Sequence, residues 1–168
     1  MPKSRSVAGR QRGLAPIWGA STRVLVLGSF PGAASLAAGQ YYAHPRNHFW
    51  PLIGELLQLP LAELPYDRRI RSLQAAGLGL WDTIVGCRRE GSLDGAIRDP
   101  EWGDPCLALD CAPRLALVCF NGKTAARALP RWRDAGLATL ALPSTSPAYT
   151  LPLTVKLEAW RAVLGALP

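Results

Sequence analysis

No apolar run in this 168-residue chain approaches the roughly 20 residues that a membrane-spanning helix needs. The N-terminal stretch MPKSRSVAGRQRG has the positive charges of a signal peptide but lacks the apolar region that must follow them. We therefore expect no membrane association and no secretion. The expected location is the cytoplasm and, in a bacterium, its nucleoid.

Metal-site spacing is also missing. The chain has four cysteines without a C-x-x-C pair, namely Cys87, Cys106, Cys111 and Cys119. Its two histidines, His44 and His48, have no carboxylate nearby in the sequence to complete a metal site. We expect reduced, unligated thiols and a protein that uses neither metal nor cofactor.

Acidic residues are few: 12 Asp and Glu stand against 19 Lys and Arg, which gives a net charge of +7 and a pI near 9.7. Such a basic surface attracts polyanions, and nucleic acid is the first candidate partner. A genome rich in GC would also produce many arginines together with the abundant Ala, Gly, Leu and Pro, so charge alone does not decide the question.

Apolar residues make up 49% of the chain and charged residues 18%, which excludes disorder, and the length suits one domain. We expect a basic, flexible leader over residues 1–22 and a single domain over residues 23–168. Short apolar runs predict strands at 23–27, 78–81, 115–120 and 138–142. Helices are predicted at 47–58, 66–76, 104–111, 123–129 and 153–167. This alternation predicts a parallel sheet covered on both faces.

Three loops that follow predicted strands hold chemically useful side chains. The first, GSFPG and the aromatic segment after it, contains Asn47, which either serves a site or caps the next helix. Asp82 ends the second strand, where α/β proteins place site residues, although an Asx turn would also explain it. Lys123 begins a helix after the third strand and would favour an anion there, but the segment is not a Walker loop.

Six blocks of the sequence together resemble one known family. They are GSFPG at 28–32, QYYAHPRNHFW at 40–50, GLWD at 79–82, REGSLDGAI at 89–97, FNGKTA at 120–125 and LPSTSPA at 142–148. In this order they are similar to the uracil-DNA glycosylase superfamily, most of all to its sixth family, the hypoxanthine-DNA (deoxyinosine) glycosylases. The resemblance spans about residues 23–164. It implies a three-layer α/β/α fold with a short, mostly parallel four-stranded sheet.

The resemblance also implies an activity. A glycosylase flips a damaged nucleotide out of the stack and hydrolyses its N-glycosidic bond, which leaves an abasic site. No cofactor or metal is needed. The expected partners are damaged DNA, duplex or single-stranded, and a downstream abasic-site nuclease, and the protein is expected to be a monomer. Because no motif places a lysine as a Schiff-base nucleophile, a monofunctional enzyme is expected.

Site residues follow from the resemblance position by position. Asn47 matches the amide that orients the attacking water, while Phe30 stands where mismatch-specific uracil relatives carry such an Asn. Asp82 lies near the base-reading position and is the second, less secure catalytic candidate. Leu142 replaces a histidine of classical uracil enzymes, so strong uracil excision is not expected.

The base pocket and the DNA contacts are implied in the same way. The pocket would be formed by the backbone of Gly28, Ser29 and Phe30, by Tyr42 stacked on the extruded base, and by His44. The DNA-binding set would be Ser144, Thr145, Ser146, Ala148, Tyr149, Lys123 and His48. Hydroxyl groups suit phosphate oxygens, and either Ala148 or Tyr149 would be the wedge that fills the gap left by the flipped base.

Two alternatives remain open. The same fold can act mainly on uracil, including a mismatch-specific mode, or on another altered base. Alternatively, the chain is a catalytically inert DNA-binding domain, or a nucleotide-binding protein that uses GSFPG and NGK as phosphate cradles.

Overall fold

The computed structural model describes residues 9–168, and its centre is a four-stranded parallel sheet. The spatial order is β3-β2-β6-β7, with β2 at Val24–Gly28, β3 at Leu78–Asp82, β6 at Leu117–Asn121 and β7 at Ala138–Leu142. Every residue of β2 and β3 is buried, as expected for strands covered on both faces. The predicted sheet is confirmed, and the strand ends lie within two residues of the expected ones.

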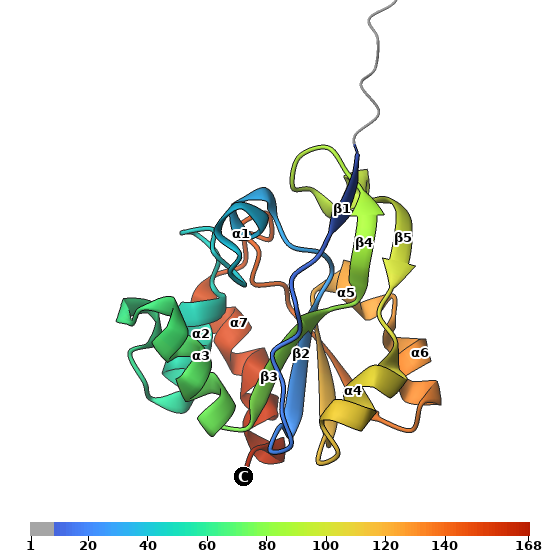
Figure 1. Ribbon diagram of the computed structural model, residues 1–168. Helices are drawn as coiled ribbons and strands as arrows, with labels where there is room; N and C mark the ends of the chain where they lie inside the picture. The colour runs from blue at the N-terminus through green and yellow to red at the C-terminus, as the bar shows by residue number, and fades with distance from the viewer. Residues whose placement is uncertain (1–8) are drawn as a thin grey trace, which may run out of the picture.

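Helices cover both faces of this sheet (Figure 1). They are α1 Ala33–Ala38, α2 Phe49–Leu57, α3 Tyr66–Ala75, α4 Pro105–Cys111, α5 Lys123–Ala126, α6 Leu129–Asp134 and α7 Leu153–Trp160. Val24 packs with α2, α3 and α7, whereas its neighbour Leu25 packs with α4, α5 and α6, because successive strand residues point to opposite faces. The predicted three-layer α/β/α fold is therefore confirmed.

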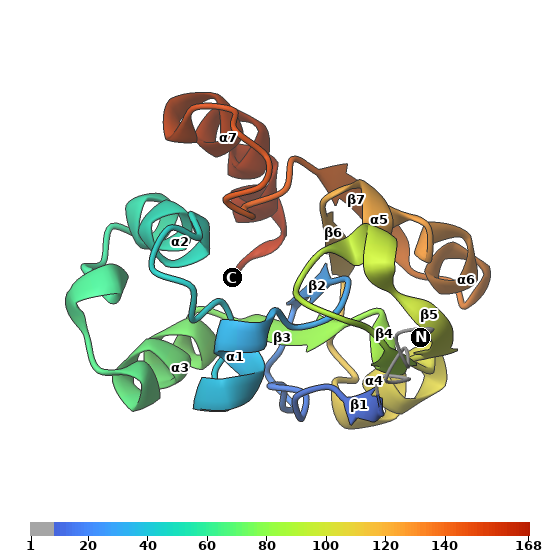
Figure 2. The same ribbon diagram turned by 90° about the horizontal axis from the view of Figure 1, so that it is seen from above.

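All four strands of the central sheet run in the same direction, so their carboxyl ends lie at one edge. Strand β2 lies between β3 and β6. The next strand of this sheet along the chain, β3, is added on one side of β2, and the strand after it, β6, is added on the other side. A crevice forms at such a switch point in open α/β sheets. Seen from above, the two groups of helices flank this edge of the sheet (Figure 2).

A second, antiparallel sheet was not predicted from the sequence. It has the order β1-β4-β5, with β1 at Arg10–Arg12, β4 at Ile84–Arg88 and β5 at Arg98–Trp102. Strands β1 and β5 are short and charged and lack the apolar alternation by which strands are recognised. β4 begins two residues after β3 ends, so this sheet continues from the central one.

The expected flexible leader is wrong for residues 9–22. Residues 10–12 pair with β4, and Ile17 forms a β-bridge with Leu80 of β3. Leu14 and Ile17 also pack on the core, which explains why the segment is held despite its charge. Residues 1–8 of the predicted leader lie outside the described residues.

The helices differ from prediction mainly at their ends. The helix expected over 123–129 is two short helices, α5 and α6, and the closing helix ends at Trp160 and continues as a 3-10 helix over Arg161–Ala166. Helix α1 was not expected at all. In the part of the chain that the structure describes, no helix combines the length and apolar character needed to cross a membrane.

Candidate active site

A cleft of about 830 Å³ lies at the carboxyl edge of the central sheet. Its wall is formed by the loops after β2, β6 and β7, by the loop between β4 and β5, and by Asp82 at the end of β3. The cleft brings together nearly all the predicted site residues, namely Gly28, Ser29, Phe30, Tyr42, His44, Asn47, Asp82, Lys123, Ser144, Thr145, Ser146, Ala148 and Tyr149. His48 is the exception in that predicted set.

The floor of the cleft is formed by Gly28 and Asp82, which lie in register at the ends of β2 and β3. A Cβ atom at position 28 would overlap the Oδ1 atom of Asp82. The glycine is therefore needed for space, because its missing side chain leaves room for the carboxyl group.

Asp82 is buried, and its Oδ2 atom has no hydrogen-bond partner among the described residues. Burial, together with the negative charge of Asp94, raises the pKa of Asp82 from its ordinary value of 3.8 to about 7, against the opposing influence of Arg89. An unpaired polar group costs free energy in a protein interior unless a ligand satisfies it. At neutral pH this carboxyl group is thus available both as an acid and as an acceptor.

Tyr42 is held in an unusual backbone conformation beside this carboxyl group, with φ of 55°. Its ring stacks on Phe49 with 4.0 Å between centroids, so one ring face is already covered. Its hydroxyl is buried without a partner among residues 9–168. Burial and the charge of Asp82 raise the pKa of Tyr42, against the effect of Asn121, and the hydroxyl stays neutral. Stacking on a base is therefore restricted to the other ring face, while the hydroxyl can donate.

Asn47 reaches the cleft from the turn before α2. Its Oδ1 atom accepts a hydrogen bond of 2.9 Å from the backbone N–H of Phe49, the first residue of α2. The N-cap position itself is His48, one residue later than predicted. The capping and site interpretations are compatible, because the bond to Phe49 fixes the amide while its Nδ2 group stays free to donate.

His44 lines the cleft next to Asn47 and is half-buried. Its Nδ1 atom accepts a hydrogen bond of 3.1 Å from the backbone N–H of Arg46. In the neutral ring the proton therefore lies on Nε2, which makes that nitrogen the donor. His44 can thus offer a hydrogen bond to a base or to a phosphate.

Thr145 is fully buried, which corrects its predicted role as a phosphate contact. Its Oγ1 atom accepts a hydrogen bond of 2.9 Å from the Nδ2 of Asn121, and its backbone N–H donates to the Oδ1 of the same amide at 2.9 Å. Thr145 therefore fixes the loop after β7. Ser144 and Ser146 differ, because each hydroxyl oxygen accepts from a backbone N–H and keeps its own hydrogen for a phosphate.

Asn121 was missed as a site residue by the sequence analysis. It ends β6, is buried and lines the cleft. The available signal was a polar residue at the carboxyl end of a strand, the same signal that pointed to Asp82. The next residue, Gly122, has φ of 98° and lies against Ser144, where a Cβ would come within 2.9 Å of the serine Cβ. This close approach brings the loop after β7 next to β6.

The two wedge candidates, Ala148 and Tyr149, are both exposed at the mouth of the cleft. Lys156 of α7 is fully buried, and its ammonium group donates a hydrogen bond of 2.8 Å to the carbonyl oxygen of Tyr149. The same ammonium lies 5.4 Å from the centre of the Tyr149 ring. The tyrosine is therefore already engaged by a cation, whereas Ala148 offers only a methyl group.

Lys123 is exposed on the wall of the cleft, where its charge can attract a phosphate. Helix α5 has four residues, so this charge, and not a long helix dipole, provides the attraction. His48 lies elsewhere: its backbone N–H donates to the carbonyl oxygen of Thr145 at 2.9 Å. Burial and nearby Lys156 lower the pKa of His48. His48 thus connects α2 with the loop after β7.

Within residues 9–168, no three His, Cys, Asp or Glu side chains group as metal ligands. The described cysteines are free, with Cys87 and Cys119 buried and Cys106 and Cys111 exposed. The polar groups that converge on the cleft are an acid, a phenol, an imidazole and amides, which bind and orient by hydrogen bonds.

The family model described as the uracil DNA glycosylase superfamily matches residues 16–164. The chain belongs to this superfamily. A uracil DNA glycosylase fold thus explains the three layers and the cleft at the carboxyl edge. The match begins before residue 23, in agreement with the packed position of Ile17.

Individual relatives are similar over nearly the whole chain. A protein named hypoxanthine DNA glycosylase from Methanosarcina barkeri is 36% identical over 90% of this chain and 96% of its own length. Another with this name, from Methanosarcina acetivorans, is 35% identical over 91% of this chain and 97% of its own. A solution structure of a putative uracil DNA glycosylase from M. acetivorans superposes with a TM-score of 0.83 at 34% identity, covering 93% of this chain and 97% of the other. The predicted superfamily and DNA glycosylase class are confirmed.

Proposed function

We propose that this DNA glycosylase removes hypoxanthine from DNA that contains deoxyinosine and leaves an abasic site. The observation that carries the proposal is the buried, unpaired carboxyl group of Asp82 at the floor of the cleft. The names of the two Methanosarcina relatives support the same substrate.

Hypoxanthine presents an N–H donor at N1 next to a carbonyl acceptor at O6. A neutral carboxyl group matches this pair, since one oxygen accepts from N1–H and the other donates its proton to O6. The pKa of Asp82, about 7, keeps much of the group neutral at physiological pH. Base binding would therefore satisfy the Oδ2 atom that the protein leaves unpaired.

Two further donors surround this base position. The neutral hydroxyl of Tyr42 and the Nε2–H of His44 both belong to the cleft wall. Either group can donate to O6 or to N7, the remaining acceptors on that side of a purine. Donation to these atoms becomes stronger as the departing base gains negative charge, and it therefore favours the transition state.

Asn47 is the residue that we assign to the attacking water. In the reaction the bond between C1′ and N9 breaks and its electron pair leaves with the base. The water oxygen bonds to C1′, and the proton lost by the water neutralises the base. An amide is too weak a base to remove that proton early, so Asn47 orients the water toward a sugar that already has oxocarbenium character.

Phosphate contacts are assigned to Ser144, Ser146 and Lys123, which line the cleft and have no acidic partner within residues 9–168. These contacts position the strand and carry no sequence information. The expected product, an abasic site, requires a nuclease that acts next in repair. We propose that the enzyme works as a monomer and forms no covalent intermediate with DNA.

Uracil is the competing substrate, because its N3–H and O4 form the same donor and acceptor pair. Position 142, which holds a histidine in the classical uracil enzymes that the chain resembles, is a buried leucine here. No imidazole at that position stabilises a uracil anion. We therefore propose hypoxanthine as the main substrate.

The test is single-turnover cleavage of labelled oligonucleotides that contain inosine, uracil or ordinary adenine, followed by alkali to cut abasic sites. Inosine cleavage with little uracil cleavage is expected. Preferred cleavage of uracil would overturn the substrate assignment, and absence of cleavage with retained DNA binding would favour the inert binding domain. Borohydride should trap no protein–DNA adduct, and a trapped adduct would contradict the monofunctional mechanism.

A further inference from the structure

Leu93 is a large apolar side chain that the proposed chemistry leaves unused. It is 68% exposed, in the loop between β4 and β5, and it lines the cleft. A single exposed leucine is ordinary on a protein surface. Its position at the mouth of the cleft and the way its loop is held distinguish it from an ordinary surface residue.

The residues on both sides of Leu93 are bonded to the segment that follows β2. Ser92 accepts, through its Oγ atom, a hydrogen bond of 2.8 Å from the backbone N–H of Ala33, the first residue of α1. Asp94 accepts, through Oδ1, a bond of 2.7 Å from the hydroxyl of Ser29. In Figure 1 the loop after β4 accordingly lies beside α1 at the top of the molecule. The polar neighbours are thus engaged within the protein, while the leucine points its apolar surface to solvent.

Arg89 holds the start of the same loop. It is 2% exposed, and its guanidinium group donates to the carbonyl oxygen of Pro31 and, at 3.5 Å, to that of Ser92. The guanidinium also lies 5.0 Å from the centre of the Phe30 ring. The arginine therefore joins the loop to the GSFPG segment in the wall of the cleft.

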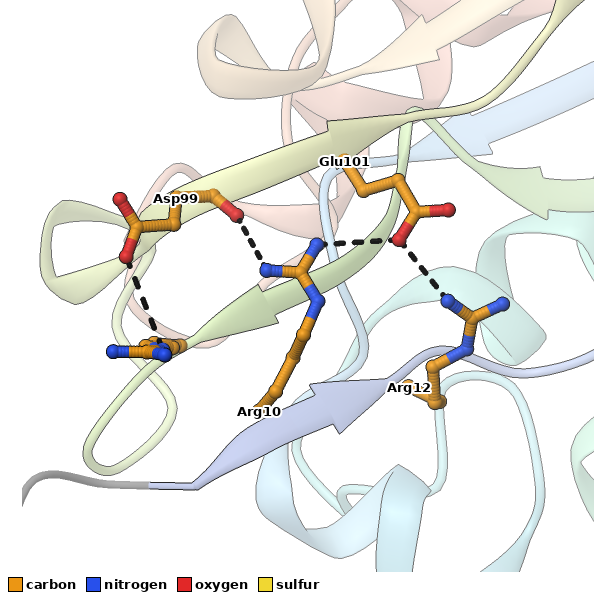
Figure 3. A network of polar contacts seen from close by, with 5 residues as sticks. Arg10, Arg12, Asp99 and Glu101 are labelled. Carbon is orange, nitrogen blue, oxygen red and sulfur yellow. Dashed lines mark hydrogen bonds and ion pairs between the residues drawn. The ribbon is translucent and has the colours of Figure 1, made fainter.

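The two strands that carry the loop are braced by β1 (Figure 3). The Oε2 atom of Glu101 in β5 forms ion pairs with the guanidinium groups of Arg10, at 3.2 Å, and of Arg12, at 3.0 Å. Arg10 also donates to the carbonyl oxygen of Asp99 at 3.2 Å. Each exposed ion pair contributes little to the free energy of folding. Together with the backbone pairing of the strands, these ion pairs fix β5 relative to β1 and β4.

We propose that Leu93 enters the DNA base stack beside the flipped nucleotide and keeps it from returning. This inference rests on the proposed function, because it needs a flipped base in the cleft. The gap left by flipping is bounded by the apolar faces of neighbouring bases, and an aliphatic side chain fills it without needing a hydrogen bond. The loop after β7 offers less for this purpose, since Ala148 is small and the ring of Tyr149 is engaged by Lys156.

A wedge acts on paired DNA and has no gap to fill in a single strand. The test compares wild type with Leu93→Ala on inosine in a duplex and on inosine in a single strand, by single-turnover cleavage. A 2-aminopurine placed next to the lesion reports unstacking through its fluorescence. Leu107→Ala is the matched control, because Leu107 is also an exposed leucine, 47% exposed, but lies on α4 outside the cleft.

Leu93→Ala should slow duplex cleavage by about tenfold or more and abolish the fluorescence rise. The variant lacks the side chain that fills the gap and keeps the neighbouring bases unstacked. Single-strand cleavage should change less than about twofold, and Leu93→Met should retain duplex cleavage. Equal losses on both substrates, or an unchanged duplex rate, would overturn the wedge. If wild type cut neither substrate, the proposed function itself would fail, an outcome separate from either of these.

Discussion

Gly28 and Asp82 lie in register on neighbouring parallel strands, and the Oδ1 atom of Asp82 occupies the space that a side chain at position 28 would need. This relationship explains why the predicted base pocket contains both residues. The glycine ends β2 directly beside the carboxyl group proposed to read the base, so the strand pairing itself sets the floor of the cleft.

Gly28→Ala should therefore displace the Asp82 carboxyl group. We expect a loss of about 100-fold in excision, since a misplacement of about 1 Å in an active site has that effect. Stability should fall by about 1–3 kcal/mol through overpacking. Gly19→Ala is the control, because a Cβ there meets no atom within 4 Å. Normal excision by Gly28→Ala would show that Asp82 does not have to keep its position.

Asn47→Ala separates a catalytic role from a capping role. Excision should fall by about 100-fold to 1,000-fold if the amide orients water. The lost bond to Phe49 should also lower the free energy of unfolding by about 1 kcal/mol. Single-turnover cleavage and urea unfolding measure the two effects.

The matched control for this variant is Asp104→Ala. Asp104 caps α4 by accepting from the N–H of Cys106, two residues ahead, at 2.9 Å, as Asn47 accepts from Phe49. The Asp104→Ala variant should lose a similar amount of unfolding free energy, about 1 kcal/mol, while its excision rate stays within about twofold of wild type. If both variants lost activity in proportion to stability, Asn47 would have no role beyond its hydrogen bond to Phe49.

The raised pKa of Asp82 makes stability depend on pH. The pKa rises on folding from 3.8 to about 7, so the native state binds this proton more tightly than the unfolded chain. The resulting stabilisation, roughly 4 kcal/mol, is complete below about pH 4 and is lost as the pH rises through about 7. Asp82→Asn should remove this decline, as measured by urea unfolding between about pH 5 and about pH 8. A wild-type curve as flat as that of the variant would contradict the shift.

Excision should follow the protonation of the same group. Hypoxanthine cleavage under single-turnover, subsaturating conditions should fall as the pH rises above about 7, because ionised Asp82 cannot donate to O6. Asp82→Asn should cleave with little pH dependence in this range, since its amide offers both an acceptor and a donor below and above about pH 7. Asp82→Ala should be slow at every pH. A decline that survives in Asp82→Asn would assign the titration to another group.

Lys123 should contribute through its charge alone. Lys123→Ala should weaken binding of DNA regardless of sequence and reduce the slope of log K against log salt by about 0.9. Arg114→Ala is the charge-matched control, because Arg114 is exposed just before β6, at the end of the sheet away from the cleft. An equal change of slope in both variants would mean that Lys123 makes no specific phosphate contact.

Much of the candidate site could be predicted because it lies at the ends of strands. The apolar runs of β2 and β3 are local patterns, and a polar residue directly after such a run is placed at the carboxyl edge of a parallel sheet. This reasoning located Asp82, whereas Gly28 entered the predicted base pocket through the family resemblance. Applied to β6, it would also have located Asn121, which the sequence analysis passed over in favour of Lys123.

Thr145 shows where a local pattern was insufficient. Its hydroxyl looked equivalent to those of Ser144 and Ser146, but it is buried and bonded to Asn121, which lies 24 residues away in the chain. The choice among three neighbouring hydroxyls depends on which one faces β6, and that direction is decided by packing. The same holds for Tyr42, whose ring face is covered by Phe49.

By itself, the sequence determined the central sheet, the family and most residues of the cleft, because apolar periodicity and short motifs are properties of neighbouring residues. The tertiary structure decided the second sheet, in which residues 10–12 pair with β4, and the attachment of the Leu93 loop by Ser29 and Asp94, 65 positions apart. These contacts join segments that are far apart in the sequence and whose own residues predict little structure. They form because the assembled core brings the segments together. The residue pattern of one segment does not predict which other segment it will contact.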